Sequence, residues 1–505
     1  MSEVLLGIDI GTSSCKAAAF LPDGSVLAQV NRSYSVRYPN PGWAEQNPED
    51  WWDAVCGAIR ELLEKGVRAD EICGIGVDGQ SWSAIAVDRT GKVLCDTPIW
   101  MDTRAQRICA DLKSRFGEER LFRVSGNPVQ PTYTMPKVLW YQEQRPEVYR
   151  NTYKILQSNS FMAYRLTGAM TQEPSQGYGW NCYDMARGVW NRELCREMGV
   201  DPALLPEIVP CDTVIGTVTE EAAQATGLRV GTPVVAGGLD AACGTLGVGV
   251  IHPGETQEQG GQAGGMSICE DTCTMDPHLI LGAHVVPGQW LLQGGTVGGG
   301  GAVNWFEKEF CAAERAAAKE KGTASLAEMD ASAKETPAGS EGLVFLPYLA
   351  GERSPIWDPD AKGVFYGIDF SKTRGHFARA VMEGVAYALR HNLETAAEAG
   401  VQAETLRAMG GAANSRLWMQ IKADVTGKKI VVPSADTATA LGAAILAGVG
   451  TGVFHDYEDA VARTVTVQRE FVPNPENEAV YAEGYAVYLG LYQNLKNIMH
   501  GVKKI

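Results

Sequence analysis

The chain opens with apolar stretches separated by short polar and glycine-containing turns. EVLLGIDI predicts a strand over residues 4–9, and a Gly/Thr/Ser turn leads into a second strand. PDG at residues 22–24 predicts a further turn before a third strand. PEDWWDAVCGAIRELLEKG has helical periodicity, with Pro48 before an acidic first turn and Gly66 after the last. EICGIGVDGQ predicts another short strand, so the start of the chain is typical of an α/β protein.

A second series with the same character begins after Gly244. GETQEQGGQAGGMSI predicts a glycine loop between strands, and WLLQGGTVGGGGAVNWFEKEF a strand, a glycine-rich turn and a helix. LRAMGGAANSRLWMQIKADVTG again predicts a strand, a glycine turn and a helix, and TATALGAAILAGVG a helix of small residues. The pattern predicts two related α/β halves, residues 1–243 and 244–505, with glycine loops that face each other.

Composition narrows the function classes. The net charge of −16, from 44 basic and 60 acidic residues, argues against a broad nucleic-acid surface. The apolar runs fall short of the roughly 20 residues of a membrane helix, and the start of the chain shows no secretory signal. The 12 cysteines are scattered without a CxxC pair, which is typical of free thiols in a reducing cytosol. We therefore expect a cytoplasmic protein without nucleic-acid or membrane partners.

Asp240 is the only carboxylate, and the only side chain charged at pH 7, in VVAGGLDAACGTLG, residues 234–247. A carboxylate among glycines, alanines and apolar residues is costly to bury unless something pairs with it. Two interpretations are open at this point. The carboxylate either has a chemical role, or it caps the helix that follows.

The turn after the first strand has the composition of a phosphate-binding loop. Gly11 allows a ligand to approach the backbone closely, and the residues after it offer hydroxyl and amide groups to phosphate oxygens. Asp9 lies where a carboxylate can reach Mg²⁺ directly or through water. A tight β-turn is the alternative for this segment alone. Further glycine loops at residues 260–265 and 294–301 favour a triphosphate site, although the chain has neither GxxxxGK(S/T) nor GxGxxG in the required context.

Four motifs resemble the FGGY carbohydrate kinases, which are members of the actin-like ATPase superfamily. GIDIGTSSCKAAAF is similar to the first phosphate loop of that family, and PGWAEQNPEDWWDAV to its early Trp-Glu-Pro segment. GVFYGIDFSKTRGHFARAVMEGVAYALR resembles the C-terminal signature, and GGAANSRLWMQIKADVTG the adenosine loop. The resemblance implies two lobes with ribonuclease-H-like sheets around a central cleft. Within the family, length and layout most resemble the xylulose kinases.

The resemblance also implies roles for individual residues. Asp240 would face the sugar hydroxyl as catalytic base and lie near the metal, and Asp9 would lie near Mg²⁺. The groups expected to contact the terminal phosphates of ATP are Thr12, Ser13, Ser14 and Lys16. Gly261 and Gln262 fall in the second phosphate loop, where the family usually has Gly-Thr. The expected nucleotide neighbours in the second half are Gly300, Asn304, Gly411, Asn414 and Ser415.

The sugar side departs from the xylulose kinase pattern. VDGQSWSAIAVD keeps Gln80, but Ser81 and Trp82 stand where the pattern has Met and His. An indole can stack on a sugar and donates one hydrogen bond, but it lacks the titratable imidazole. Ala241 replaces the usual Asn or Gln after the base. Further substrate-side candidates, on the resemblance, are Trp100, Asp102, Arg104 and Thr132.

These features predict an ATP- and Mg²⁺-dependent kinase that phosphorylates a hydroxyl of a ketose or polyol. The resemblance favours a pentulose such as D-xylulose, whereas the substitutions at residues 81 and 82 leave ribulose or another ketose or polyol open. A non-catalytic actin-like nucleotide-binding module is the alternative from another class, and it would not require Asp240. The expected partners are the sugar and ATP, and a homodimer is left open.

Overall fold

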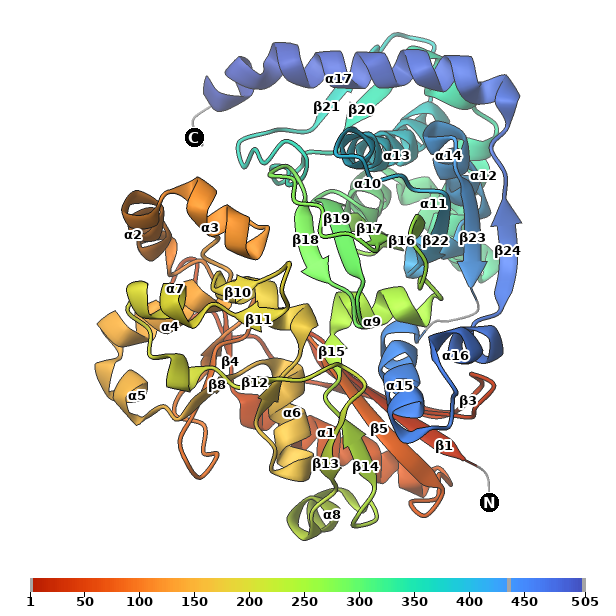
Figure 1. Cartoon of the computed structure of the whole chain (residues 1–505). Coiled ribbons are helices and arrows are strands. Elements are labelled where there is room, and N and C mark those ends of the chain that lie inside the picture. The colour runs from red at the N-terminus through yellow and green to blue at the C-terminus, as the bar shows by residue number, and fades with distance from the viewer. Residues whose placement is uncertain (1–2, 434–436, 502–505) are drawn as a thin grey trace.

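The computed structural model describes residues 3–433 and 437–501, which form two lobes, one above the other in Figure 1. The first lobe is built on a mixed sheet in which β1, β2 and β3 are antiparallel, whereas β5 pairs in parallel with β1 and β14 with β5. The strands across this sheet are β13 (Val214–Thr217), β14 (Pro233–Val235), β5 (Ile72–Gly79), β1 (Val4–Ile10), β2 (Ser14–Phe20) and β3 (Val26–Ser33). The strand predicted over residues 4–9 is thus β1, one residue longer than expected.

The second lobe repeats this plan. Strands β16, β17 and β19 are antiparallel, and β22 and β23 continue the sheet in parallel with β16. The strands in order are β18 (Ile280–Ala283), β19 (Trp290–Thr296), β17 (Gly264–Glu270), β16 (Glu255–Gly260), β22 (Thr405–Met409), β23 (Lys429–Pro433) and β24 (Val467–Phe471). The repeated chain order is that of the ribonuclease-H-like halves that the sequence predicts.

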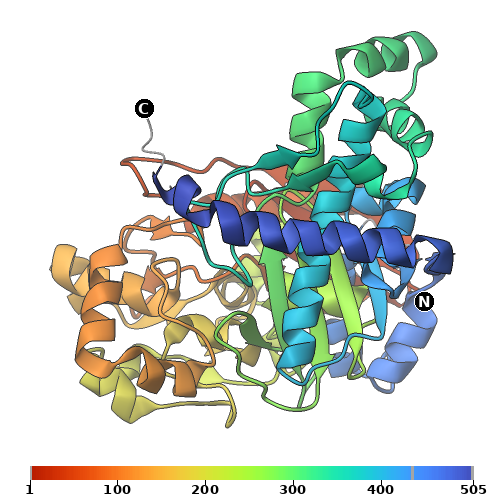
Figure 2. The ribbon, with the colours of Figure 1, turned by 90° about the horizontal axis from the view of Figure 1, so that it is seen from above.

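Helices alternate with the strands in both lobes. In the first lobe α1 (Pro48–Glu64) and α6 (Ser158–Thr167) pack on the sheet, and in the second α13 (Arg374–Glu398) and α14 (Arg416–Thr426) do so. The predicted helix after Pro48 is α1, and the Asn47 side chain caps it by accepting a hydrogen bond from the Glu49 N–H. Helix α17 (Glu478–Gly501) crosses the top of the second lobe, as Figure 2 shows.

The remaining elements lie around this frame. The other helices are α2 (Gln106–Phe116), α3 (Glu118–Ser125), α4 (Thr134–Gln144), α5 (Pro146–Asn151), α7 (Arg192–Glu197), α8 (Glu220–Thr226), α10 (Gly300–Phe310), α11 (Ala312–Lys321), α12 (Ser325–Lys334) and α16 (Tyr457–Thr464). The short strands are β4 (Glu45–Gln46), β6 (Ile85–Val87), β7 (Thr97–Pro98), β8 (Lys154–Leu156), β9 (Thr171–Gln172), β10 (Tyr183–Asp184), β11 (Val189–Trp190), β12 (Glu207–Ile208), β15 (Gly238–Leu239), β20 (Val344–Leu346) and β21 (Val364–Tyr366). The 3₁₀ turns are η1 (Pro174–Trp180), η2 (Pro202–Leu204), η3 (Ala338–Gly342), η4 (Gly411–Asn414) and η5 (Pro475–Asn477). Within the described ranges, no helix is both long enough and apolar enough to cross a membrane.

Two helices join the lobes. Helix α9 (Asp240–Gly247) lies between them in Figure 1, and α15 (Ala438–Thr451), although it belongs to the second half of the chain, packs on β1 and β5 of the first sheet and on α9. Glycines make this contact possible, because a Cβ at Gly442 would lie 1.9 Å from the Cys243 carbonyl oxygen. A Cβ at Gly76 of β5 would lie equally close to the Ala443 oxygen. The predicted boundary after residue 243 falls inside α9.

A buried histidine, His284, lies near this junction. Its surroundings predict that the folded protein loses stability in acid. His284 Nδ1 accepts the Val285 N–H at 2.9 Å and Nε2 lies 3.0 Å from the Val250 oxygen, so the neutral ring satisfies both contacts. Burial lowers the pKa of His284 from 6.5 to about 4. Between these values the unfolded chain binds the proton more tightly than the folded chain does. The free energy of unfolding therefore falls as the pH falls from 6.5 to 4, with a share of about 3 kcal/mol from this residue.

We expect the His284→Gln variant to be less stable at pH 7 but to lose less stability on acidification. Urea unfolding of both proteins at pH 7, 6, 5 and 4.5 measures how steeply the free energy of unfolding changes with pH. An equal decline in the two proteins would contradict the assignment to His284.

Candidate active site between the lobes

A cavity of about 280 Å³ lies between the lobes. It contains Asp240 and groups from both halves of the chain. Its first-lobe lining is Thr12, Ser81, Trp82, Trp100, Asp240 and Ala241, and its second-lobe lining is Gln257, Gln259, Ala263, Gly264, Gly265, Met266, Ser267, Ile280, Gln293, Gly294, Gly295, Arg353 and Ser354. The structure thus brings together five of the predicted site residues, Thr12, Ser81, Trp82, Trp100 and Asp240, from four separate segments.

A row of charged side chains crosses the first sheet where its parallel strands end. Asp9 at the end of β1 is paired across the sheet with Lys16 of β2 on one side and with Asp78 of β5 on the other. Residues in register point to the same face. Ligands bind at the carboxyl ends of parallel strands in open α/β sheets, so this row lies at the expected edge.

Asp78 has an unusual environment. Its side chain is fully buried, and neither carboxylate oxygen has a hydrogen-bond partner among the described residues. Burial, together with the charges of Asp9 and Asp240, raises the pKa of Asp78 well above its usual range. Adjacent buried carboxylates are strongly disfavoured unless a cation or a proton is shared between them.

These acids fit a magnesium ion better than a metal held by protein alone. The described part of the chain has no group of three or more His, Cys, Asp or Glu side chains arranged to hold a metal. Mg²⁺ usually keeps several waters and takes one or two carboxylates plus substrate phosphates. The unpartnered oxygens of Asp78 beside Asp9 are consistent with that kind of site.

Asp240 is the first residue of α9, and the residue at the N-cap is Leu239. Among the described residues, only the N–H of the next residue, Ala241, donates to the Asp240 Oδ1, at 2.7 Å. Burial, with a smaller contribution from Asp9, raises the pKa of Asp240 to about 7. The carboxylate therefore makes no N-cap hydrogen bond further into the helix, and it lines the cavity.

A buried polar network positions the backbone just before Asp240. The Leu239 N–H donates to Ser175 Oγ at 2.8 Å, and Ser175 Oγ donates to Glu173 Oε2 at 2.5 Å. Gln176 Nε2 donates to the Gly79 and Gln80 oxygens, at 3.3 and 3.2 Å. The 3₁₀ turn η1 thus links the segment before Asp240 to the loop that follows β5.

The first phosphate-loop candidate is the turn between β1 and β2. It is closed by a hydrogen bond from the Gly11 N–H to the Ser14 oxygen at 3.0 Å. Two side chains hold Thr12: Trp100 Nε1 donates to its hydroxyl at 2.9 Å, and Gln46 Nε2 to its carbonyl at 2.8 Å. Ser13 at the tip is exposed, and Ser14 and Lys16 are partly exposed. The turn is therefore rigid on one side and open on the other.

The second candidate loop is the hairpin between β16 and β17, which holds Gly261 and Gln262. It touches the start of α10 so closely that a Cβ at Gly300 would lie 2.5 Å from the Gly261 oxygen. The Gly301 N–H donates to the Gln262 oxygen at 2.9 Å. Asn304, one turn later in α10, is exposed.

The adenosine-side candidates lie beside this hairpin. A Cβ at Gly260 would lie 2.2 Å from the Ala412 Cβ, which places η4 against the hairpin base. Gly411 and Asn414 are exposed, and no atom lies within 4 Å of a Cβ built at Gly411. Ser415 caps α14 by accepting the Trp418 N–H at 3.0 Å, and it donates to Asp330 at 2.5 Å. The three glycine-rich segments of the second lobe therefore converge.

Trp82 enters the cavity from a strained backbone. Its φ of 53° lies in the left-handed region, which is uncommon for a bulky residue. The Trp82 N–H donates to Gln176 Oε1 at 3.1 Å, and its carbonyl accepts from the buried Lys137 Nζ at 2.9 Å. The indole packs against Tyr133 and Tyr178, with centroid separations of 4.7 and 5.4 Å. Such strain persists where the surroundings enforce it, and it is concentrated at functional sites.

The other sugar-side candidates lie outside the cavity lining. Asp102 is buried in an ion pair with Arg104 at 2.7 Å and accepts the Ala44 N–H. The Arg104 guanidinium lies 3.8 Å from the centroid of the Trp43 ring. Gln80 is buried and donates to Gln46 Oε1 at 2.8 Å, and Thr132 precedes the buried Tyr133. In this structure Gln80 is linked through Gln46 to the turn at Thr12, and Asp102 and Arg104 contact the segment of Trp43 and Ala44.

Sequence reasoning missed several of these groups. Asp78 had a usable signal, because it lies near the end of an apolar strand and shortly before a glycine, as Asp9 does. Lys137 and Gln46 had none, since their partners lie in distant segments: main-chain oxygens for Lys137, and the Thr12 oxygen and the Gln80 side chain for Gln46.

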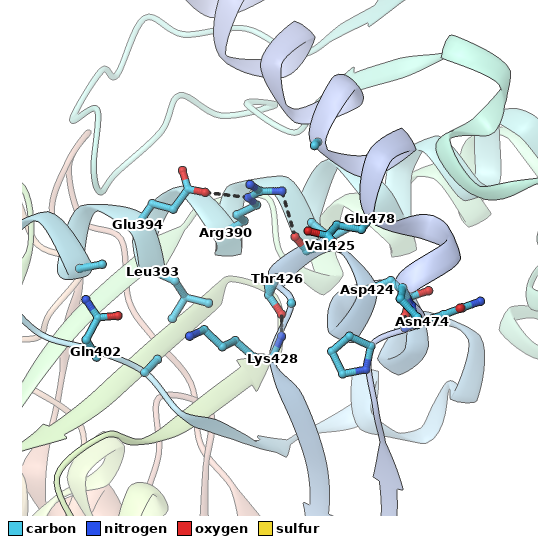
Figure 3. Close-up of a pocket in the computed structure, with 16 residues that line it drawn as sticks. Arg390, Leu393, Glu394, Gln402, Asp424, Val425, Thr426, Lys428, Asn474 and Glu478 are labelled. Carbon is cyan, nitrogen blue, oxygen red and sulfur yellow. Dashed lines mark hydrogen bonds and ion pairs between the residues drawn. The ribbon is translucent and has the colours of Figure 1, made fainter.

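A larger cavity of about 510 Å³ lies on the second lobe, between α13, the end of α14 and α17 (Figure 3). Its charged groups are mostly engaged with one another. Arg390 donates to Glu394 at 2.8 Å and to the Val425 oxygen at 3.4 Å, and Asp424 accepts from Gln420 and Asn477. The cavity between the lobes is therefore the stronger candidate for chemistry.

Comparison with known proteins agrees with the geometry. The N-terminal domain of the FGGY family of carbohydrate kinases matches residues 4–247, and the C-terminal domain matches residues 268–451. A xylulose kinase of Bacillus subtilis (strain 168) is 30% identical over 504 residues, 99% of each chain. An autoinducer-2 kinase of Salmonella typhimurium is 30% identical over 98% of this chain and 95% of its own length. The crystal structure of xylulose kinase from Rhodospirillum rubrum has a TM-score of 0.90 at 32% identity, over 99% of this chain and all of that one.

The predicted two-lobed fold is thereby confirmed, since it extends over the full length of a solved kinase. Matches to both family domains cover most of the described residues and both sides of the cavity. The chain belongs to the FGGY family of carbohydrate kinases.

Proposed function

We propose that this carbohydrate kinase transfers the γ-phosphoryl group of ATP to a hydroxyl of a ketose or polyol, with a pentulose such as D-xylulose as the preferred class. The observation that carries the proposal is the shared cavity, in which Asp240 lies between the turn at Thr12 and the hairpin at Ala263 and Gly264. A base for the hydroxyl and two loops for phosphate are the parts that phosphoryl transfer requires. A cytoplasmic location and a homodimer stay predictions.

In this proposal ATP spans the two lobes. The triphosphate would lie between the turn of Thr12, Ser13 and Ser14 and the hairpin of Gly261 and Gln262. The adenosine would lie against α10 and η4, beside Gly300, Asn304, Gly411, Asn414 and Ser415. Asp9 and Asp78 would hold Mg²⁺ through its waters, with Asp240 nearby, and the ion would neutralise charge on the phosphates. The tight contacts among the glycine segments support close approach by backbone groups.

Asp240 would orient the sugar hydroxyl and accept its proton. As the hydroxyl oxygen bonds to phosphorus, the bond to the ADP oxygen breaks, and the proton passes to the Asp240 carboxylate. An alcohol is a far weaker acid than a carboxyl group, so this transfer comes late in the reaction. The raised pKa of Asp240 makes it a better proton acceptor than an exposed aspartate.

The sugar would lie on the first-lobe side, against Trp82 and Ser81. Trp100 lines the same space while it holds Thr12, so the sugar and phosphate sites share a wall. Relatives with the same 30% identity carry the names of different substrates. The preference for a pentulose therefore rests on the resemblance to xylulose kinases, and Ser81 and Trp82 are the side chains that leave another ketose or polyol open.

A panel of ketoses and polyols with coupled detection of ADP tests the proposal. We expect sugar-dependent ADP formation with pentuloses at the head of the ranking. ADP formation with a different sugar class would replace the substrate assignment. Nucleotide binding without turnover on any sugar would instead favour a non-catalytic module.

Trp82→His is expected to shift the ratio of kcat/KM values toward D-xylulose by roughly fivefold, because one net hydrogen bond contributes about 1 kcal/mol. Histidine also adopts the left-handed conformation more readily than tryptophan does. Steady-state kinetics over the sugar panel measure the shift, with the melting temperature as control. Equal loss on every sugar together with a lower melting temperature would assign Trp82 to packing instead.

A further inference from the structure

Arg353 is held rigidly at the second-lobe wall of the cavity. Its two neighbours are bonded to the end of β19: Glu352 accepts the Val297 N–H at 2.8 Å, and Ser354 Oγ accepts the Gly295 N–H at 2.5 Å. The Thr296 hydroxyl also donates to Glu352. The backbone of Arg353 is therefore fixed on both sides.

The guanidinium group itself has no partner within residues 3–433 and 437–501. Among the described residues, none forms an ion pair with it or accepts a hydrogen bond from its side chain, and its Nε is buried. Burial lowers the pKa of Arg353, although the Glu352 charge opposes this shift. Arg353 is partly buried, and a cation withdrawn from water without an anion is costly, so such a group is otherwise found paired or coordinated. A rigid backbone that presents an unpaired guanidinium to a cavity indicates a site for an anionic ligand.

The surroundings identify the anion. A Cβ built on Gly295 would lie 3.2 Å from Arg353 Nη2 and 3.3 Å from the Gly264 oxygen, so the guanidinium lies beside the end of the hairpin loop. Thr12 and Asp240 line the same cavity. The positive group thus lies among the phosphate-loop residues and opens onto the space shared with the base.

We propose that Arg353 binds the phosphoryl group during its transfer, pairing with its non-bridging oxygens while Asp240 takes the hydroxyl proton. The proposal rests on the proposed use of ATP. Negative charge is spread over three equatorial oxygens in this transition state, and a planar guanidinium can donate to two of them at once. On the first lobe, Asp9 and Asp78 would act on the triphosphate through Mg²⁺, and Lys16 would bind it directly. On the second lobe, Arg353 would bind the transferred phosphoryl group.

Arg353→Gln is expected to lower kcat by on the order of 10²–10³-fold, the loss found for removing one donor to a developing oxyanion. The KM for sugar should change little, and Arg353→Lys should recover part of kcat, because Lys keeps the charge but loses the bidentate fork. The apo protein should melt no lower than the wild type, since the substitution breaks no contact. Arg123→Gln on α3, an exposed arginine paired with Glu119, is the matched control and should leave kcat unchanged.

Binding of ADP with magnesium and aluminium fluoride, a mimic of the transferring phosphoryl, separates the outcomes. We expect calorimetry to show that aluminium fluoride tightens ADP binding to the wild type, with or without a panel sugar, but not to Arg353→Gln. Equal tightening in both proteins, or none in a wild type that binds ADP, would overturn the role of Arg353. A wild type that does not bind ADP would contradict the proposed function itself. Weakened sugar affinity with kcat preserved would also overturn this role, and would show that Arg353 binds an anionic group of the substrate instead.

Discussion

Asp240→Asn is expected to lower the rate of phosphoryl transfer by on the order of 10²–10⁴-fold, the range for losing a general acid–base group. The amide oxygen can still accept the Ala241 N–H, so the start of α9 should keep its geometry. What the variant loses is the negative charge and the ability to take the hydroxyl proton. Turnover with the best sugar of the panel, followed by ADP formation, measures the loss.

Controls show whether the loss of turnover comes from the chemical step and not from weaker nucleotide binding or a less stable fold. ADP affinity by calorimetry and the melting temperature should stay near those of the wild type, because the side chain has one hydrogen bond and the substitution keeps it. Asp111→Asn, at an exposed position of α2 that pairs with Arg115, should be as active as the wild type. Near-native turnover of Asp240→Asn would reject the role of the carboxylate as base.

Gly442→Ala is expected to lower the free energy of unfolding by about 3 kcal/mol or more, at the upper end of the cost of overpacking. The added methyl group would lie 1.9 Å from the Cys243 oxygen, so α15 and α9 would have to separate by more than an ångström. The opposite contact is equally tight, because a Cβ at Gly247 would lie 1.8 Å from the Ala438 oxygen. With tight contacts on both helices, α15 and α9 cannot make room for a methyl group by a small shift.

Gly490→Ala in α17 is the matched control, since it is also a helical glycine and no atom lies within 4 Å of its added Cβ. This variant should be stabilised by up to about 1 kcal/mol, the difference in helix propensity. Urea unfolding of the three proteins at pH 7 compares them. A Gly442→Ala variant as stable as Gly490→Ala would show that the helix contact is looser than the structure has it.

Local sequence patterns predicted several strands, helices and turns of the two lobes. β1, α1 and the glycine turns follow from apolar spacing, from Pro48 at the helix start and from Gly at the turns. Asp9 and Asp240 were identifiable because each stands out against apolar or small neighbours. Whether the candidate residues bind ATP and sugar stays a prediction.

Longer-range features were not predictable from one sequence. Asp78 reaches Asp9 only through the parallel register of β1 and β5, whose strands are more than 60 residues apart in the chain. Asp102 and Arg104 were assigned to the cleft, yet their mutual pairing depends on the fold around Trp43. Arg353 carried no local signal, because what distinguishes it is the lack of a side-chain partner in the described part of the fold.

The docking of α15 has a consequence for synthesis on the ribosome. The face of the first sheet that carries Gly7 and Gly76 is covered by a helix that ends at residue 451, so it stays bare while strands β16 to β23 of the second sheet are translated. A nascent chain that has completed the first half thus still exposes apolar strand surface, which is prone to aggregation and to chaperone capture. The two lobes are consequently one unit of folding, although each has its own sheet.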